Sequence, residues 1–195
     1  MGKFLKRWFW RLAIVLTGAV LLYQLWILGH IVYWNSYNPS GSAFMQERLD
    51  VMQEKKPDAT LRYQWVPYEQ ISPHLKRAII AAEDGKFLQH EGFDFEAIQK
   101  AYEKNLEKGK LVMGGSTISQ QLAKNLFLSG KKTPWRKIEE AVITLMLENV
   151  MSKRRILEIY LNKIEWGNGV FGAEAASRYY YGVSASALTL SLIHI

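Results

Sequence analysis

The stretch AAEDGKFLQHEGFD, at residues 81–94, places two adjacent carboxylates at the end of a small apolar run. On a 3.6-residue period Glu83 lines up with Leu75 and Ile79, so its carboxylate is expected to project from an apolar helix face. Burial in such a setting raises the pKa of a carboxyl group and suits a general acid or base near neutral pH. Two alternatives stay open, an exposed residue at a helix end and an ion pair with Arg77 or Lys86.

The helix that would position Glu83 has a clear start. Ser72-Pro73 combines a capping residue with proline at the first helical position, and the helix is predicted to run from about His74 to Phe87. His90 follows it, but no second His or Cys stands at metal-ligand spacing. A structural, hydrogen-bonded histidine is therefore the favoured interpretation of His90.

A second candidate is GGSTISQQLAKN, at residues 114–125, a Gly-Gly turn that runs into a helix capped by Ser116 or Thr117. The free N–H groups of a first helical turn favour an anion or a polar sugar oxygen. The glycine spacing is not that of a nucleotide-binding P-loop. The alternative is a loop that needs glycine for its geometry, with Gln120 and Gln121 on the helix surface.

Charged residues follow in two further helices. In RKIEEAV, at residues 136–142, Arg136 and Glu140 stand four apart, a spacing typical of a solvated helix-stabilising pair. Periodicity leaves open whether Glu139 or Glu140 faces inward. In SKRRILEIYLN, at residues 152–162, three cations occupy a first turn, where the helix dipole disfavours them. A phosphate is one candidate partner for these cations, and Glu158 or exposure to solvent are the other candidates.

The N-terminal segment indicates a membrane helix. Residues 12–34 contain no Asp, Glu, Lys or Arg and, as a helix, span about 34 Å at roughly 1.5 Å per residue, enough to cross a bilayer core. Lys3, Lys6, Arg7 and Arg11 precede it and are expected to stay in the cytoplasm. They are four of the 25 basic residues, which leaves 21 basic against 18 acidic residues and a net charge of +3 for the rest. A cleaved signal peptide is the alternative, but the apolar span is long for one.

The rest of the chain reads as one mainly α domain without cysteine, so disulfides and thiolate chemistry are excluded. The small basic excess and the extracytoplasmic location disfavour nucleic acid as a partner. The predicted organisation is a basic N-terminus at 1–11, a transmembrane helix at 12–34, a linker and membrane-proximal segment at 35–59, and a globular domain at 60–195. The elements expected after residue 34 are helices at about 43–56, 94–108, 117–128, 134–150 and 152–162, an extended segment at 60–66, a glycine loop at 167–172, and a last helix that Gly182 ends.

Five motifs in this order resemble the peptidoglycan glycosyltransferase family, and most closely its monofunctional biosynthetic transglycosylases. The resemblance covers roughly residues 60–190 and rests on Glu83-Asp84-x-x-Phe87-x-x-His90-x-Gly92, GGSTISQQLxKN, Arg136-Lys137-x-x-Glu140, KxxILExYLN and WGNGVFGAEAASRYYYG. One departure is Asn168, where relatives commonly carry Asp. The chain also ends in LTLSLIHI, earlier than the family's helical sequence, so a C-terminal truncation is expected.

The resemblance implies a lysozyme-like fold and an inverting glycosyl transfer from lipid II. In that scheme Glu83 is the general base, and Glu140, rather than Glu139, is the second carboxylate near the leaving pyrophosphate. No cofactor is obligatory, and a divalent cation, Mg²⁺ or Mn²⁺, is optional. The implied substrate-binding residues are Asp84, Phe87, His90, Gly115, Ser116, Thr117, Gln120, Gln121, Lys124, Asn125, Arg136, Lys137, Lys153, Glu158, Tyr160 and Asn162.

The implied partners are lipid II, the growing lipid-linked glycan, the bilayer, and cell-wall synthesis or division proteins. The implied location is the bacterial inner membrane, with a single pass, a cytoplasmic N-terminus and a periplasmic catalytic domain. Two other functions fit parts of the pattern: a lysozyme-like enzyme that cleaves glycan, and a catalytically impaired protein that holds lipid II without turnover.

Overall fold

The computed structural model describes residues 2–130 and 133–194, and it is mainly α-helical, as predicted. The side chain of Lys3, part of the predicted basic N-terminus, lies outside this description, as do the side chains of residues 193–195. The helices are α1 (Gly2–Ser36), α2 (Ala43–Lys55), α3 (Pro73–Glu83), α4 (Phe95–Lys108), α5 (Ile118–Phe127), α6 (Pro134–Val150), α7 (Lys153–Lys163), α8 (Ala173–Tyr181) and α9 (Leu190–His194), with 3-10 turns η1 (Tyr68–Gln70) and η2 (Ala185–Ala187).

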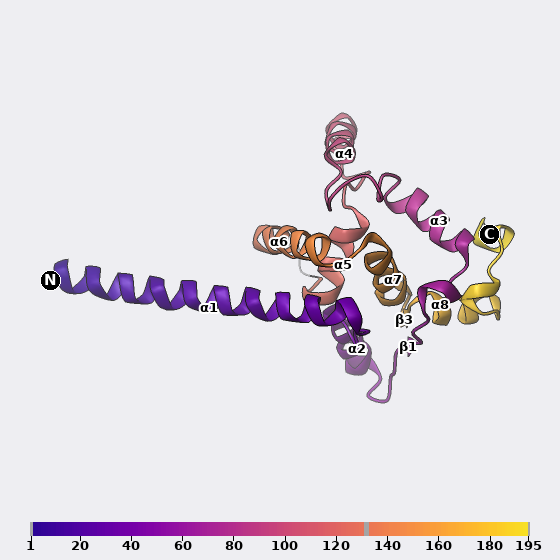
Figure 1. Cartoon of the computed structure of the whole chain (residues 1–195), viewed down its shortest axis with the longest axis horizontal. Coiled ribbons are helices and arrows are strands. Elements are labelled where there is room, and N and C mark those ends of the chain that lie inside the picture. The colour runs from indigo at the N-terminus through magenta and orange to yellow at the C-terminus, as the bar shows by residue number, and fades with distance from the viewer. Residues whose placement is uncertain (1, 131–132, 195) are drawn as a thin grey trace.

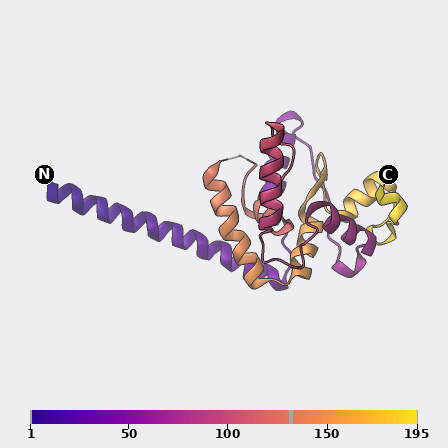
Figure 2. The ribbon, with the colours of Figure 1, turned by 90° about the horizontal axis from the view of Figure 1, so that it is seen from above.

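Helix α1 contains the predicted membrane span and projects from the rest of the chain as a long rod (Figures 1 and 2). Among the described residues it is the one helix long and apolar enough to cross a membrane, and most of its apolar residues are exposed. Its far end carries the N-terminus, while its C-terminal turns contact the domain.

The core of the domain surrounds α5, which packs against α6, α7 and α2. Ile118 and Leu122 of α5 are fully buried, and so are Ile143 of α6 and Ile156 of α7. Each of these three helices begins at a side-chain cap, provided by Thr117, Thr133 and Ser152. The predicted starts of these helices are therefore confirmed, and the caps fix where each amphipathic face begins.

A small three-stranded sheet lies beside the helices in the order β1-β3-β2. Strand β1 (Arg62–Tyr63) pairs in parallel with β3 (Val170–Phe171), and β2 (Glu165–Gly167) pairs with β3 in antiparallel fashion. The prediction of a glycine loop at 167–172 missed this hairpin. Strands of two or three residues are too short to show a two-residue alternation, and β1 lies about 100 residues away in the sequence.

Helix α3 ends at Glu83, so the prediction that it continues to Phe87 is wrong. Asp84 leaves the helical conformation at φ −161° and ψ 74°, and turns occupy residues 85–89. The Asp84 side chain accepts a hydrogen bond from the backbone N–H of Ile118, which holds it on α5 instead. This tertiary contact outweighs the local preference for another helical turn.

Candidate active site

Glu83 lies exposed at the C-terminal end of α3 and borders two hollows. Of the interpretations left open by the sequence, the structure shows the exposed residue at a helix end, because α3 ends at Glu83 and its side chain leaves the core. The Glu83 carboxylate is therefore not buried on the apolar face. The first hollow, of about 210 Å³, is lined by Ala82–Gly85, Asp94 and Ala97, and Met113–Thr117. The second, of about 440 Å³, is lined by Phe44, Ile79, Glu83, Gln121, Lys124, Asn125, Tyr160, Ile164, Glu165 and Trp166.

The Glu83 carboxylate is oriented by Gln121. Gln121 Nε2 donates to Glu83 Oε2 at 2.9 Å, and Gln121 Oε1 accepts from the Tyr160 hydroxyl at 3.0 Å. Burial, and then the charges of Glu83 and Asp84, raise the pKa of Tyr160 far above its usual range. Tyr160 therefore keeps its proton and stays a donor, which fixes Gln121 with its amide N–H group toward Glu83.

Asp84 is the buried carboxylate of the pair, with 6% of its surface exposed. Its Oδ1 lies 2.8 Å from His90 Nε2, and its Oδ2 accepts from the Ile118 N–H at 3.0 Å. His90 Nδ1 accepts from the Gly92 N–H at 3.1 Å, so Nε2 carries the ring proton and donates it to Asp84. His90 is thus a hydrogen-bonded structural residue, as its isolation in the sequence indicated.

Three N–H groups at the start of α5 already have partners within the protein. The Thr117 N–H donates to Gln120 Oε1, the Gln120 N–H donates to Thr117 Oγ1, and the Ile118 N–H donates to Asp84. The anion at this helix N-terminus is Asp84 itself. Gln120 is buried in the capping box, and Thr117 also donates to the Gly92 carbonyl at 2.7 Å.

The Gly-Gly turn lies directly against α4. A Cβ at Gly115 would come within 2.9 Å of the Ile98 Cα atom, so this position has no room for a side chain. The close approach brings Gly115 and the exposed Ser116 into the lining of the first hollow.

Glu140 is buried, with 3% of its surface exposed, so the solvated interpretation of the pair with Arg136 is wrong. Arg136 Nη1 donates to Glu140 Oε2 at 2.9 Å, and Lys137 Nζ contacts Glu140 Oε1. Lys137 Nζ also lies 3.3 Å from Ser116 Oγ. Ser116 therefore connects the Glu83 hollow to the Glu140 cluster, and two cations lie beside the second carboxylate.

The three cations at the start of α7 have carboxylate partners, and Glu158, one of the candidates from the sequence, is the partner of Arg155. Lys153 Nζ donates to Glu148 Oε1 at 2.7 Å and lies over the Phe87 ring, and Arg155 Nη1 donates to Glu158 Oε2 at 2.7 Å. Arg154 pairs with Glu69 on the surface. The structure thus places Lys153 beside the loop that follows Glu83, and outside the lining of either hollow.

Two residues of the KxxILExYLN motif hold the chain segment before α3. Glu158 Oε1 accepts from the Tyr68 N–H, and Asn162 bonds both the N–H and the carbonyl of Val66. Of the implied substrate-binding residues, those that line the hollows or contact Ser116 are Asp84, Gly115, Ser116, Thr117, Gln121, Lys124, Asn125, Lys137 and Tyr160. Arg136 joins them through Glu140, while Phe87, His90, Gln120, Lys153, Glu158 and Asn162 support the site from outside the linings.

Sequence reasoning missed several residues that line the second hollow with Glu83, three of them aromatic or charged. Phe44 comes from α2, and Glu165 and Trp166 come from β2. Trp166 belongs to the motif WGNGVFG and could have been identified as a ring suited to stacking on a sugar. Phe44 carries no such signal, because α2 meets the site only through tertiary packing.

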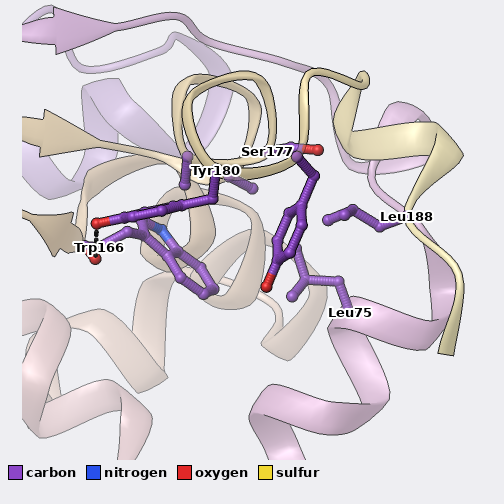
Figure 3. Close-up of a pocket in the computed structure, with 8 residues that line it drawn as sticks. Leu75, Trp166, Ser177, Tyr180 and Leu188 are labelled. Carbon is purple, nitrogen blue, oxygen red and sulfur yellow. Dashed lines mark hydrogen bonds between the residues drawn. The ribbon is translucent and has the colours of Figure 1, made fainter. Parts of the chain in front are cut away.

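Trp166 also borders an aromatic hollow of about 310 Å³ between α3 and α8 (Figure 3). The Tyr180 hydroxyl donates to the Trp166 carbonyl at 3.1 Å, and Leu75 and Leu188 close the opposite side. Its lining contains no carboxylate, histidine or lysine. This hollow therefore offers a surface for packing and stacking, whereas the hollows that Glu83 borders contain carboxylates.

The carboxylates Asp84 and Glu140 are already engaged by protein partners. Within residues 2–130 and 133–194, no three His, Cys, Asp or Glu side chains are grouped as metal ligands. Both oxygens of Asp84 accept hydrogen bonds, and both oxygens of Glu140 contact cationic side chains. The positive charge near Glu140 comes from side chains of α6.

Comparison with known proteins identifies the family. A family model described as Transglycosylase matches residues 50–194. A biosynthetic peptidoglycan transglycosylase of Nitrosospira multiformis is 73% identical over 95% of this chain and 81% of its own length. Proteins of the same name from Methylobacillus flagellatus and Chromobacterium violaceum are 65% and 63% identical, each over 96% of this chain and 82% of the relative. The mainly α architecture is accordingly the lysozyme-like one that the motifs implied, and the chain belongs to the transglycosylase family.

Proposed function

We propose that the chain is a peptidoglycan glycosyltransferase that polymerises lipid II into β-1,4-linked glycan strands and releases undecaprenyl diphosphate during bacterial cell-wall synthesis. The family match and the printed name of the relatives support this proposal. The observation that carries it is the position of Glu83, an exposed carboxylate between two hollows and oriented by Gln121.

In the proposed reaction Glu83 accepts the proton of the acceptor sugar's 4-hydroxyl group. The hydroxyl oxygen forms a bond to the anomeric carbon of the growing chain, and the bond from that carbon to the lipid pyrophosphate breaks, with inversion. A base must lie within hydrogen-bond reach of the proton that it takes, and only an exposed carboxylate can be reached by a sugar hydroxyl. The exposure of Glu83 supports this role, and the Gln121 hydrogen bond supports a fixed orientation of the base.

The departing pyrophosphate is assigned to the cationic side of the site. Lys137 has half of its side chain exposed and lies between Glu140 and Ser116, and Lys124 lines the second hollow. Charge-assisted hydrogen bonds from such side chains stabilise the charge that develops on a leaving phosphate. Glu140 then serves to hold Arg136 and Lys137 in place. The optional Mg²⁺ or Mn²⁺ stays a prediction, and no step of this reaction requires it.

The proposed location is the bacterial inner membrane, with α1 as a single-pass anchor, the N-terminus in the cytoplasm and the catalytic domain in the periplasm. The basic residues before the span support this orientation. Helix α6 packs beside α1 and has one exposed apolar face, formed by Trp135, Ile138, Val142 and Leu145. An exposed apolar face next to the membrane helix supports close contact of the domain with lipid. Cell-wall synthesis or division proteins stay predicted partners.

The choice of substrate tests the function. Purified chain is incubated separately with labelled lipid II and with finished peptidoglycan sacculi. We expect glycan polymer from lipid II and no soluble fragments from sacculi. Fragments from sacculi without polymer would favour the glycan-cleaving alternative. Binding of lipid II without polymer would favour the alternative of a catalytically impaired protein that holds lipid II without turnover.

A further inference from the structure

The C-terminal turns of α1 are part of the domain's core. Ile27 and Ile31 are fully buried, and the Trp34 ring lies 5.2 Å from the ring of Phe127 on α5. Helix α6 packs along the same part of α1 (Figure 1). Packing on one side sets the general direction of α1, but apolar contacts are non-directional and leave room for rotation about the contact.

A single side chain of α7 binds the end of α1. Arg155 donates from Nε and Nη2 to the Trp34 carbonyl at 2.9 and 2.8 Å, and from Nη2 to the Tyr37 carbonyl at 2.7 Å and to Asn38 Oδ1 at 3.0 Å. The last carbonyls of a helix have no partner within it. The planar guanidinium, with five fixed donors, is suited to bind several of these acceptors at once.

The electrostatics of this contact favour α1 as the partner of Arg155. At the start of α7 a cation is disfavoured by the dipole of its own helix, whereas at the C-terminal end of α1 it is favoured. Glu158 neutralises the remaining charge through Nη1. The Arg155 side chain is only 12% exposed, so water and salt screen this contact less than a surface ion pair.

Helix α7 also contacts the elements that hold Glu83. Glu158, the ion-pair partner of Arg155, accepts from the N–H of Tyr68, which begins η1 and leads directly into α3. One turn further along α7, Tyr160 reaches Gln121, the donor to Glu83. Helix α7 therefore contacts both the end of the membrane helix and Gln121, the residue that orients the Glu83 carboxylate.

We propose that Arg155 is a positioning residue that fixes the angle between α1 and the catalytic domain, so that the Glu83 hollows meet a membrane-embedded substrate at the right height. This proposal rests on the proposed function. A lipid-linked sugar is confined to the bilayer surface, and a change of angle at the end of a long helix moves the site relative to that surface. A substrate free in solution imposes no such condition.

The first test compares Arg155→Gln with Arg154→Gln, a matched control that removes the neighbouring cation, whose side chain is mostly exposed and pairs with Glu69. Each protein is placed in liposomes and supplied with long-chain lipid II in the same membrane or with a short-chain, water-soluble analogue. We expect Arg155→Gln to lower kcat/KM for the long-chain substrate roughly tenfold or more, as misplacement of a reacting group does. With the short-chain analogue its rate stays within about twofold of the unaltered protein, and Arg154→Gln changes neither rate. Equal losses with both substrates, or no loss with either, would overturn the proposal.

A second measurement does not depend on turnover. The chain has no cysteine, so Val20→Cys on α1 and Lys108→Cys on α4, both exposed, take spin labels at these two positions alone. We expect a narrow distance distribution in the otherwise unaltered chain and in Arg154→Gln, and a broad or displaced one in Arg155→Gln. An unchanged distribution in Arg155→Gln would overturn the proposal even if no polymer is formed. If the otherwise unaltered chain and both variants give the expected distance distributions but the unaltered chain forms no glycan polymer, the result would instead contradict the proposed function.

Discussion

Gln121 donates a 2.9 Å hydrogen bond to Glu83, and it joins α5 to the last residue of α3 at the point where two hollows meet. The Tyr160 hydroxyl holds the other end of the Gln121 amide. The orientation of the proposed base is therefore set by α5 and α7 together, and by neither helix alone.

Substitution of Gln121 tests this arrangement. Gln121→Glu replaces the donor by a second carboxylate. We expect the rate of lipid II polymerisation to fall roughly 10- to 100-fold, which corresponds to the free energy of a hydrogen bond to a charged group. The matched variant Gln120→Ala removes the capping box and is expected to lower stability by about 1 kcal/mol while the rate per folded molecule is kept. Rates and thermal unfolding are measured for both. A normal rate in Gln121→Glu would show that Glu83 needs no orientation.

The burial of Glu140 predicts that its two cationic partners, Arg136 and Lys137, contribute differently to stability. Arg136→Ala leaves a buried carboxylate with only the half-exposed Lys137, and we expect a loss of about 3 kcal/mol in the free energy of unfolding, the low end for a broken buried pair. Lys137→Ala is expected to cost less than about 1 kcal/mol, because that side chain is largely hydrated. Thermal unfolding in detergent measures both. Similar losses in the two variants would contradict the burial of the Arg136 pair.

The loop after Glu83 depends on glycine at position 92. Gly92 has φ +91°, and an added Cβ would lie 2.8 Å from the Thr144 Cγ2 atom. We expect Gly92→Ala to lower the free energy of unfolding by about 1–3 kcal/mol, the usual cost of such a backbone conformation. Gly85→Ala, where no atom lies within 4 Å, is expected to stay within about 0.5 kcal/mol. Equal melting temperatures for the two variants would show that residues 84–92 do not hold this geometry.

The burial of Lys163 leads us to predict that the free energy of unfolding depends on pH. Lys163 is fully buried against Tyr63 and Met45, and burial lowers its pKa to about 7. An unfolded lysine titrates near about 10.4, so between these values the unfolded chain binds more protons and the free energy of unfolding rises with pH. The pKa of Tyr63 is raised to about 12 by burial, so this ring stays neutral throughout.

Replacement of this lysine isolates its contribution. We expect Lys163→Met to stabilise the protein by about 1–4 kcal/mol at pH 7, because a buried charge is removed from an apolar setting. The advantage should fall as the pH approaches 10. Thermal unfolding of both proteins from pH 6 to pH 10 measures this, and a difference independent of pH would assign the effect to packing alone.

Local signals in the sequence were sufficient for most helices. Ser72-Pro73 and Thr133-Pro134 carry both a capping group and the preset proline angle, and the observed helices begin at these positions. Caps act within one turn, so neighbouring residues suffice to predict them. The membrane span was predicted for the same reason, since its signal is an uninterrupted apolar run.

The features that the sequence did not predict depend on contacts between segments that are distant in the sequence. Asp84 occupies the N-terminus of α5 from 34 residues away, and this contact ends α3 early and leaves Glu83 exposed. Periodicity describes one helix at a time and contains no information about these partners.

The most direct measurement is polymerisation of labelled lipid II by the purified, detergent-solubilised chain beside Glu83→Gln. The exposed Glu91→Gln serves as a matched control, and circular dichroism verifies that all three are folded. We expect glycan polymer from the unaltered chain and from Glu91→Gln, and none from Glu83→Gln. Polymer formed by folded Glu83→Gln at the normal rate would contradict the assignment of Glu83 as the base.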